Sequence, residues 1–158
     1  MITTQEIPSI AALSEVTADN LRKIGANVEV VVSDWGTMVA RRGKKDPPGQ
    51  GGWNLFHTTV GGATMSSPVT NFTINSSCDG KNWFGWPCDA KTEALRAAFI
   101  QSADEGPSQP ALEALHRHLW EALPDIPLGQ YVQPFAWRSN VSGVLRAHLL
   151  VFWNIDKN

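Results

Sequence analysis

A helical stripe followed at once by a valine-rich strand most constrains the fold of this chain. Apolar or small residues recur every three or four positions through residues 9–25, which predicts a helix with Ser9 as N-cap and Gly25 just beyond its last turn. Residues 27–33 read NVEVVVS, and their alternating valines predict a strand. A helix, a glycine and a strand in this order form half of an α/β unit, so we predict the α/β fold class.

The same patterns predict the other elements. Asp34 is placed to cap a short helix over residues 35–42, and a second strand is expected over residues 53–59. Two helices follow, over residues 89–103 with Asp89 as cap and over residues 109–123. We expect these helices to pack against a sheet that contains both strands. The tail, residues 126–155, predicts short strands with a turn at Ser139–Asn140.

Length and charge limit the classes of protein. The 158 residues predict a single domain over residues 1–158. A formal net charge of −2 provides no electrostatic footprint for nucleic acid. Apolar runs fall short of the roughly eighteen residues of a transmembrane helix. The opening MITTQEIPSI has neither the basic nor the apolar region of a signal peptide, so we expect none here.

Catalytic and metal-binding signatures are missing from the sequence. The chain contains no GxSxG, HExxH, GxGxxG or phosphate-loop motif, so it is predicted not to be an enzyme and to need no cofactor. His116 and His118 are two positions apart on a predicted helix and point to different faces, which disfavours a shared metal ion. His57 lies in an apolar strand, where a hydrogen-bonded structural histidine is expected rather than a base.

Tryptophans and a glycine turn favour a binding surface over a reaction centre. The chain has seven tryptophans and one tyrosine, and indole rings serve both cores and ligand grooves. Gly61–Gly62 follow the second predicted strand, with hydroxyl-bearing residues on both sides. Flat apolar walls with backbone and hydroxyl hydrogen-bonding groups suit a small ligand. One interpretation is a stand-alone carbohydrate-binding module that uses exposed tryptophans.

Five segments in order resemble the C-terminal part of bacterial family 5 extracellular solute-binding proteins, the receptors of dipeptide- and oligopeptide-type ABC importers. They are LRKIGANVEVVVSDWGTMVARR, GGWNLFHT, WFGWPCDAKTEALRAAF, PLGQYVQPFAWRSNVSGV and VFWNI, and the likeness runs from about residue 7 to residue 156. The resemblance implies part of one lobe of a type II periplasmic-binding-protein fold, with residues 1–158 as a fragment of the C-terminal lobe. It further implies solute capture between two lobes, a membrane permease as partner, a periplasmic location and a monomer.

By this resemblance, the segment after the GGWNLFHT strand faces the ligand. The predicted ligand-binding residues are Thr58, Thr59, Val60, Gly61, Gly62 and Ala63, with Trp35 as an indole wall. In peptide-binding relatives this loop carries an acid that pairs with the α-amino group of the peptide. Residues 58–68 contain no Asp or Glu, and neither Asp34 nor Asp79 matches that motif. The ligand is therefore a peptide, a blocked peptide, a sugar-like molecule or another small solute.

The resemblance also bears on Cys78 and Cys88. The family resides outside the cytoplasmic membrane, an oxidising location in which paired cysteines tend to be bonded. We therefore predict a Cys78–Cys88 disulfide that orders the aromatic cluster between its cysteines. The alternative is two unpaired thiols packed as small apolar side chains.

Overall fold

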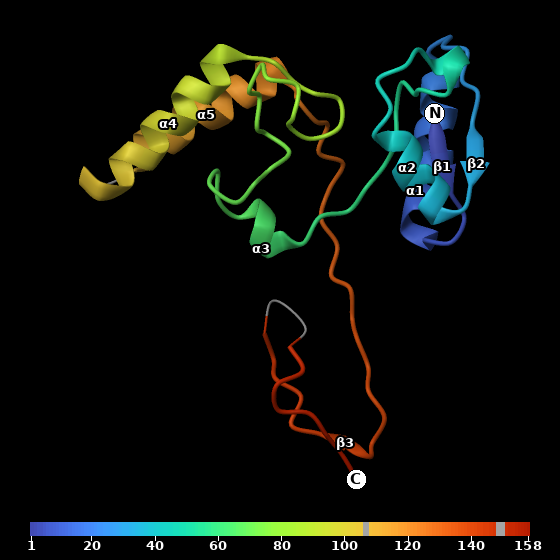
Figure 1. The fold of residues 1–158 in the computed structure, drawn as a ribbon, viewed down its shortest axis with the longest axis vertical. Coiled ribbons are helices and arrows are strands. Elements are labelled where there is room, and N and C mark those ends of the chain that lie inside the picture. Colours follow the sequence, from blue (N-terminus) through green and yellow to red (C-terminus); the bar gives the residue numbers. More distant parts are fainter. Residues whose placement is uncertain (106–107, 148–150) are drawn as a thin grey trace. The chain divides into compact units, whose positions relative to one another are not determined.

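The structure is a computed structural model that describes residues 1–105, 108–147 and 151–158, with the side chains of residues 103–105 left aside. The chain divides into two compact units, Met1–Val60 and Gly61–Asn158 (Figure 1). Each unit has its own buried residues.

A small parallel sheet lies at the centre of the first unit. Strand β1, Ile2–Thr4, pairs in parallel with β2, Val31–Ser33, with Ile2 opposite Val31. On its other side, Ile2 forms a parallel bridge with Phe56 and donates its N–H to the Leu55 carbonyl at 3.0 Å. β1 therefore lies between β2 and the Phe56 bridge, and residues 53–59 do not form the predicted second strand of this sheet.

The strand bounds predicted from the sequence were too long. Only Val31–Ser33 of the predicted strand 27–33 joins the ladder, and the predicted strand 53–59 contributes the single bridge at Phe56. The physical reason is the length of the middle strand, because β1 offers only three residues to pair with. β1 itself was missed, since three residues are too few to show a period.

The helices of this unit start and stop for local reasons. Helix α1 covers Pro8–Lys23, and its N-cap is Ile7 rather than the predicted Ser9, because Pro8 occupies the first turn with its fixed φ. Gly25 follows with φ 89°, the left-handed conformation expected of it. Helix α2 covers Trp35–Arg42 as predicted, and the Asp34 side chain accepts the Thr37 N–H at 2.9 Å. A short 3-10 helix, η1, covers Pro48–Gln50.

The core of the first unit forms where α1 and α2 pack on β1. Its buried apolar side chains are Ile2, Ile10, Ala11, Ala18 and Met38. The hydroxyl groups of Thr3 and Ser14 and the ring of His57 are buried beside them and bond to one another. Because these polar groups are paired, their burial is compatible with a packed core.

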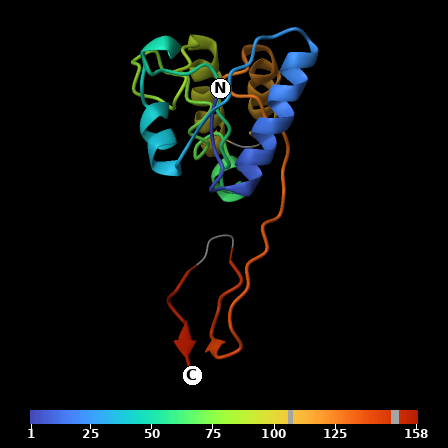
Figure 2. The same ribbon diagram turned by 90° about the vertical axis from the view of Figure 1, so that its right-hand side faces the viewer.

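The second unit contains a helical pair and a short hairpin. After α3, Gly62–Met65, an irregular stretch leads to α4, Ala90–Glu105, and α5, Gln109–Ala122, which lie side by side (Figure 1). Strands β3, Val141–Ser142, and β4, Asp156–Lys157, pair antiparallel after a turn at residues 139–140 (Figure 2). The predicted strand near the end of the chain includes Leu149 and Leu150, which lie outside the described residues; the rest of it, from Val151, is not a strand before Asp156.

These helices and small sheets confirm the α/β class. Both predicted helices of the second unit are present within two residues of the expected bounds. Their packing against the sheet of the first unit stays a prediction.

Candidate functional site

Three segments leave the parallel sheet at the same edge. β1 ends at Thr4 and leads to Glu6, β2 ends at Ser33 and leads to Trp35, and the Phe56 bridge leads to Thr58. In open α/β sheets, ligands bind outside the carboxyl ends of the strands. We call Glu6, Trp35 and residues 58–60 the carboxyl-edge site. The structure therefore brings Trp35 and the first half of the predicted ligand segment to one edge.

Trp35 is held from both its backbone and its ring. Its N–H donates to Oε2 of Glu6 at 2.9 Å. The Arg42 guanidinium carbon lies 5.8 Å from the centroid of the Trp35 ring and 5.3 Å from that of Phe56, within cation–π range of both. Arg42 is buried, and this burial lowers its pKa. The half-buried indole thus belongs partly to the packing of the unit.

His57, the residue before Thr58, is held by hydrogen bonds of its ring to α1. Its Nδ1 lies 3.1 Å from Ser14 Oγ and its Nε2 lies 2.9 Å from Thr17 Oγ1, both on α1. Thr3 donates to Ser14 Oγ at 2.8 Å, which leaves the Ser14 proton for Nδ1. Burial lowers the pKa of His57, so the neutral ring is favoured. The prediction of a hydrogen-bonded structural histidine is confirmed.

The predicted ligand segment crosses the boundary between the two units. Residues 58–60 end the first unit, and residues 61–63 begin the second, where Gly61 accepts the N–H groups of Thr64 and Met65 at the start of α3. Thr59 and residues 61–63 are exposed. Gly61 has φ −60°, and a Cβ built on either glycine has no heavy atom within 4 Å. The backbone therefore does not require glycine at these two positions.

Asp34 and Asp79, which lie on either side of the segment in sequence, are engaged in local turns. Asp34 caps α2, and hydrogen bonds from Thr37 lower its pKa. Asp79 accepts the Lys81 N–H and the Ser77 hydroxyl, and these bonds lower its pKa. Glu6 is the acid that the structure adds to the carboxyl edge. Sequence reasoning missed it because it lies 29 residues from Trp35 and follows a strand too short to recognise.

The Cys78–Cys88 disulfide is present, with the two Cα atoms 4.5 Å apart. Inside its loop, the Asn82 side chain donates to the carbonyls of Asn75 and Pro87. The Trp83 ring lies 4.5 Å from that of Phe72 and 4.7 Å from that of Phe84. The predicted disulfide and the aromatic cluster it encloses are thus both part of the structure.

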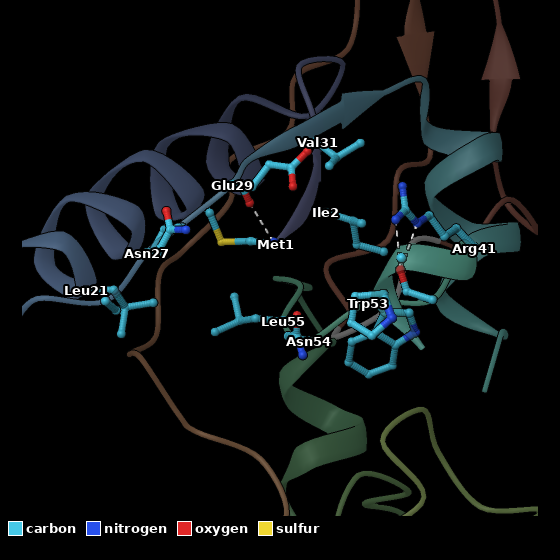
Figure 3. Close-up of a pocket in the computed structure, with 15 residues that line it drawn as sticks. Met1, Ile2, Leu21, Asn27, Glu29, Val31, Arg41, Trp53, Asn54 and Leu55 are labelled. Carbon is cyan, nitrogen blue, oxygen red and sulfur yellow. Dashed lines mark hydrogen bonds between the residues drawn. The ribbon is translucent and has the colours of Figure 1, made fainter. Parts of the chain in front are cut away.

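A surface pocket of about 740 Å³ lies at the amino end of the same sheet (Figure 3). Its lining includes Met1, Glu29, Val31, Trp53 and Asn54, and the Arg41 guanidinium at its rim donates to the Gly52 carbonyl at 2.8 Å. The amino group of Met1 donates to the Glu29 carbonyl at 2.7 Å, and partial burial lowers its pKa. This pocket and the carboxyl-edge site therefore occupy opposite ends of the strands.

Two further properties concern only the part of the chain that the structure describes. Among those residues, no three His, Cys, Asp or Glu side chains gather as metal ligands would. No helix in the same residues combines the length and the apolar character needed to cross a bilayer.

Comparison with known proteins finds a relative that is named as a periplasmic-binding protein of a transporter. No family model matches the chain. Over 144 residues it is 35% identical to a protein of Sinorhizobium fredii (strain NBRC 101917 / NGR234) named "Probable peptide ABC transporter periplasmic-binding protein y4tO". The match covers 91% of this chain and 27% of that relative, so the chain spans little more than a quarter of the relative's length. The mixed helices and small sheets fit an α/β fragment of a periplasmic-binding protein.

Proposed function

We propose that this chain is part of the solute receptor of an ABC importer, with a peptide or a related small solute as ligand. The observation that carries the proposal is the 35% identity over 91% of the chain to a protein named as a peptide ABC transporter periplasmic-binding protein. In this proposal the chain, residues 1–158, belongs to the C-terminal lobe and does no chemistry on the solute. Its partner is a membrane permease, its location is the periplasm, and it acts as a monomer.

In this proposal the carboxyl-edge site and residues 61–63 contact the solute. Trp35 offers a half-buried indole, and Thr58 and Thr59 offer hydroxyl groups. The exposed backbone at Gly61 and Gly62 is open to close approach, because nothing lies where a side chain would project. These groups suit the peptide bonds and apolar side chains of a ligand.

The acidic residues of the chain affect which peptides can bind at the proposed contact. Asp34 and Asp79 already accept hydrogen bonds within their own turns, and Glu6 accepts the Trp35 N–H. Residues 58–68 bring no acid of their own. We therefore propose that the contact along residues 58–63 is neutral and accepts a peptide with a blocked amino terminus as well as a free one.

A chimera tests the proposal. The matched 144-residue segment of the Sinorhizobium relative is replaced by the corresponding residues of this chain, and peptide binding is measured by calorimetry. We expect the chimera to bind short peptides and to bind N-acetylated and free forms within about threefold of one another. A folded chimera that binds no peptide, while the unaltered relative does, would contradict the proposed function.

The isolated chain provides a second measurement. One lobe supplies only part of the contacts to a ligand held between two lobes, and joining the lobes makes the second set of contacts intramolecular. We expect the chain alone to bind the same peptides much more weakly than the chimera. Equal affinities would mean that the solute is not shared between lobes.

A further inference from the structure

Glu6 makes two hydrogen bonds that join separate segments of the first unit. Its backbone N–H donates to Oγ1 of Thr4, the buried last residue of β1, at 3.2 Å. Its side-chain Oε2 accepts the N–H of Trp35 at 2.9 Å, although the two residues are 29 positions apart in sequence. Because Trp35 is the first residue of α2, the Glu6 side chain connects the end of β1 to the start of this helix.

The start of α2 uses both a local and a distant hydrogen-bond acceptor. The first four N–H groups of an α-helix have no partner within the helix. Asp34, the N-cap, accepts the Thr37 N–H at 2.9 Å, which is a local contact. The Trp35 N–H is instead satisfied by Glu6, from the loop after β1. A distant acceptor does what a local cap does not do, because it also fixes the start of the helix relative to the end of a strand.

The two ends of α2 are held by different contacts. In the last turn, the Arg42 guanidinium lies 5.3 Å from the centroid of the Phe56 ring. In the first turn, the bond from Trp35 to Glu6 ties the helix to the loop after β1. If the Glu6 bond is lost, the first turn is restrained less than the last turn, and the Trp35 ring moves with it. The placement of this ring at the carboxyl edge therefore depends on Glu6.

Resting on the proposed function, in which Trp35 contacts the solute, we propose that Glu6 is a positioning residue for Trp35. A binding group contributes its full interaction only when neighbouring residues hold it close to its productive geometry. Glu6 supplies this support as a hydrogen-bond acceptor. Its negative charge is not what the role requires, so an uncharged acceptor on a side chain of the same length takes its place.

Substitutions in the chimera test the role through peptide affinity, measured by calorimetry. Glu6→Ala removes the acceptor, and we expect peptide binding to weaken about tenfold, the size of effect expected for a hydrogen bond to a charged group. Glu6→Gln keeps an amide oxygen and is expected to restore the affinity to within about threefold of the unaltered chimera. Asp34→Ala is the matched control, because it removes the local cap of the same helix and leaves the acceptor of the Trp35 N–H in place.

A spectroscopic measurement reports on the Trp35 ring itself. The chimera is labelled with fluorotryptophan, and the Trp35 resonance is assigned in the fluorine NMR spectrum as the one that Trp35→Phe removes. We expect Glu6→Ala to shift this resonance and Glu6→Gln to leave it close to its original position. The resonance of Trp83, in the second unit, is the internal control and stays where it is in all variants.

The outcomes separate positioning from a general effect on the helix. Equal weakening of peptide binding by Glu6→Ala and Asp34→Ala, in variants that circular dichroism shows to be folded, would mean that only the stability of α2 matters and would overturn the proposal. Failure of Glu6→Gln to restore the affinity would overturn it as well, since the charge would then be the essential property. An unmoved Trp35 resonance in Glu6→Ala excludes positioning directly. If the unaltered chimera binds no peptide, the proposed function fails, whereas the Trp35 resonance still decides whether Glu6 places the ring.

Discussion

Nε2 of His118 lies 2.5 Å from Oδ2 of Asp89, and this contact joins the start of α4 to the middle of α5. The same carboxylate accepts the Lys91 N–H at 3.0 Å and the Thr92 hydroxyl at 2.8 Å. The bonds from His118 and Thr92 lower the pKa of Asp89 from 3.8 to about 2. One side chain thus caps a helix and ties it to its neighbour, as the capping pattern in the sequence had indicated for α4 alone.

Asp89 predicts a loss of stability in acid. Its pKa is lower in the folded than in the unfolded chain, so its contribution is fully present above about pH 3.8 and is lost as the pH falls toward 2. Asp89→Asn removes the ionisable group, and we expect the variant to be less stable near neutral pH and to lose less stability across this window. Urea unfolding followed by circular dichroism measures both effects. Asp19→Asn, on the exposed face of α1, is the control, and identical acid profiles for Asp89→Asn and wild type would contradict the prediction.

His57 predicts a second pH dependence, at higher pH. Burial lowers its pKa below the ordinary 6.5, so the unfolded chain takes up the proton first. The stability due to the neutral ring is present above pH 6.5 and falls as the pH drops through that value toward the lower folded pKa. His57→Leu leaves the Ser14 and Thr17 hydroxyls without the ring, at an expected cost of about 1–3 kcal/mol near neutral pH. The free energy of unfolding is measured against pH for both proteins. If His57→Leu keeps the wild-type slope, His57 is not the source of this pH dependence.

The disulfide predicts a local gain in stability. The bond closes a ring with a sequence separation of 10, and loop entropy makes such a ring worth up to about 3 kcal/mol. Reduction, or the Cys78→Ser/Cys88→Ser double variant, is expected to lower the unfolding midpoint and to loosen the packing of Trp83 on Phe72. Intact-mass measurement after alkylation, with and without reductant, checks the bond in protein made in an oxidising compartment. Two alkylated thiols without reductant would show that the bond does not form there.

Gly52 and Gly62 predict opposite responses to substitution. A Cβ on Gly52 would lie 1.7 Å from the Asp46 carbonyl oxygen, whereas a Cβ on Gly62 meets nothing within 4 Å. Gly52→Ala forces the backbone of the loop to shift, so we expect a loss of about 2 kcal/mol or more. Gly62→Ala is the matched control and should be neutral or slightly stabilising, because alanine favours the α3 helix. Thermal unfolding of both variants checks the prediction, and equal midpoints would contradict it.

A bulkier change at Gly62 separates stability from binding. Gly62→Leu should fold, because the space beside this position is open, but the added side chain would project from the segment proposed to face the solute. We expect the chimera described above to lose at least about tenfold in peptide affinity with this substitution. Circular dichroism confirms the fold. Unchanged peptide affinity in a folded variant would remove this part of the segment from the site.

Local signals in the sequence predicted the helices well. Asp34 is the N-cap of α2 and Gly25 follows the C-cap of α1, so each marks its helix boundary through interactions within a few neighbouring residues. The sheet was harder to predict, because the pairing of Ile2 with Val31 and Phe56 joins residues far apart in sequence. The same distance hid Glu6, whose bond to Trp35 exists only once β1 and β2 are side by side. The Cys78–Cys88 disulfide was predicted from the resemblance to a family and not from a local pattern in the sequence.

The central place of β1 has a consequence for how the first unit forms during translation. Residues 2–4 leave the ribosome well before their partners at Val31 and Phe56. Until Phe56 has emerged, the nascent chain holds an incomplete sheet with one side of its middle strand unpaired. Helix α1 can form as soon as it is made, since its hydrogen bonds are local, but the sheet has to wait for contacts of long sequence separation. Synthesis of the first unit therefore ends in a single late closing step, at which the His57 ring reaches Ser14 and Thr17.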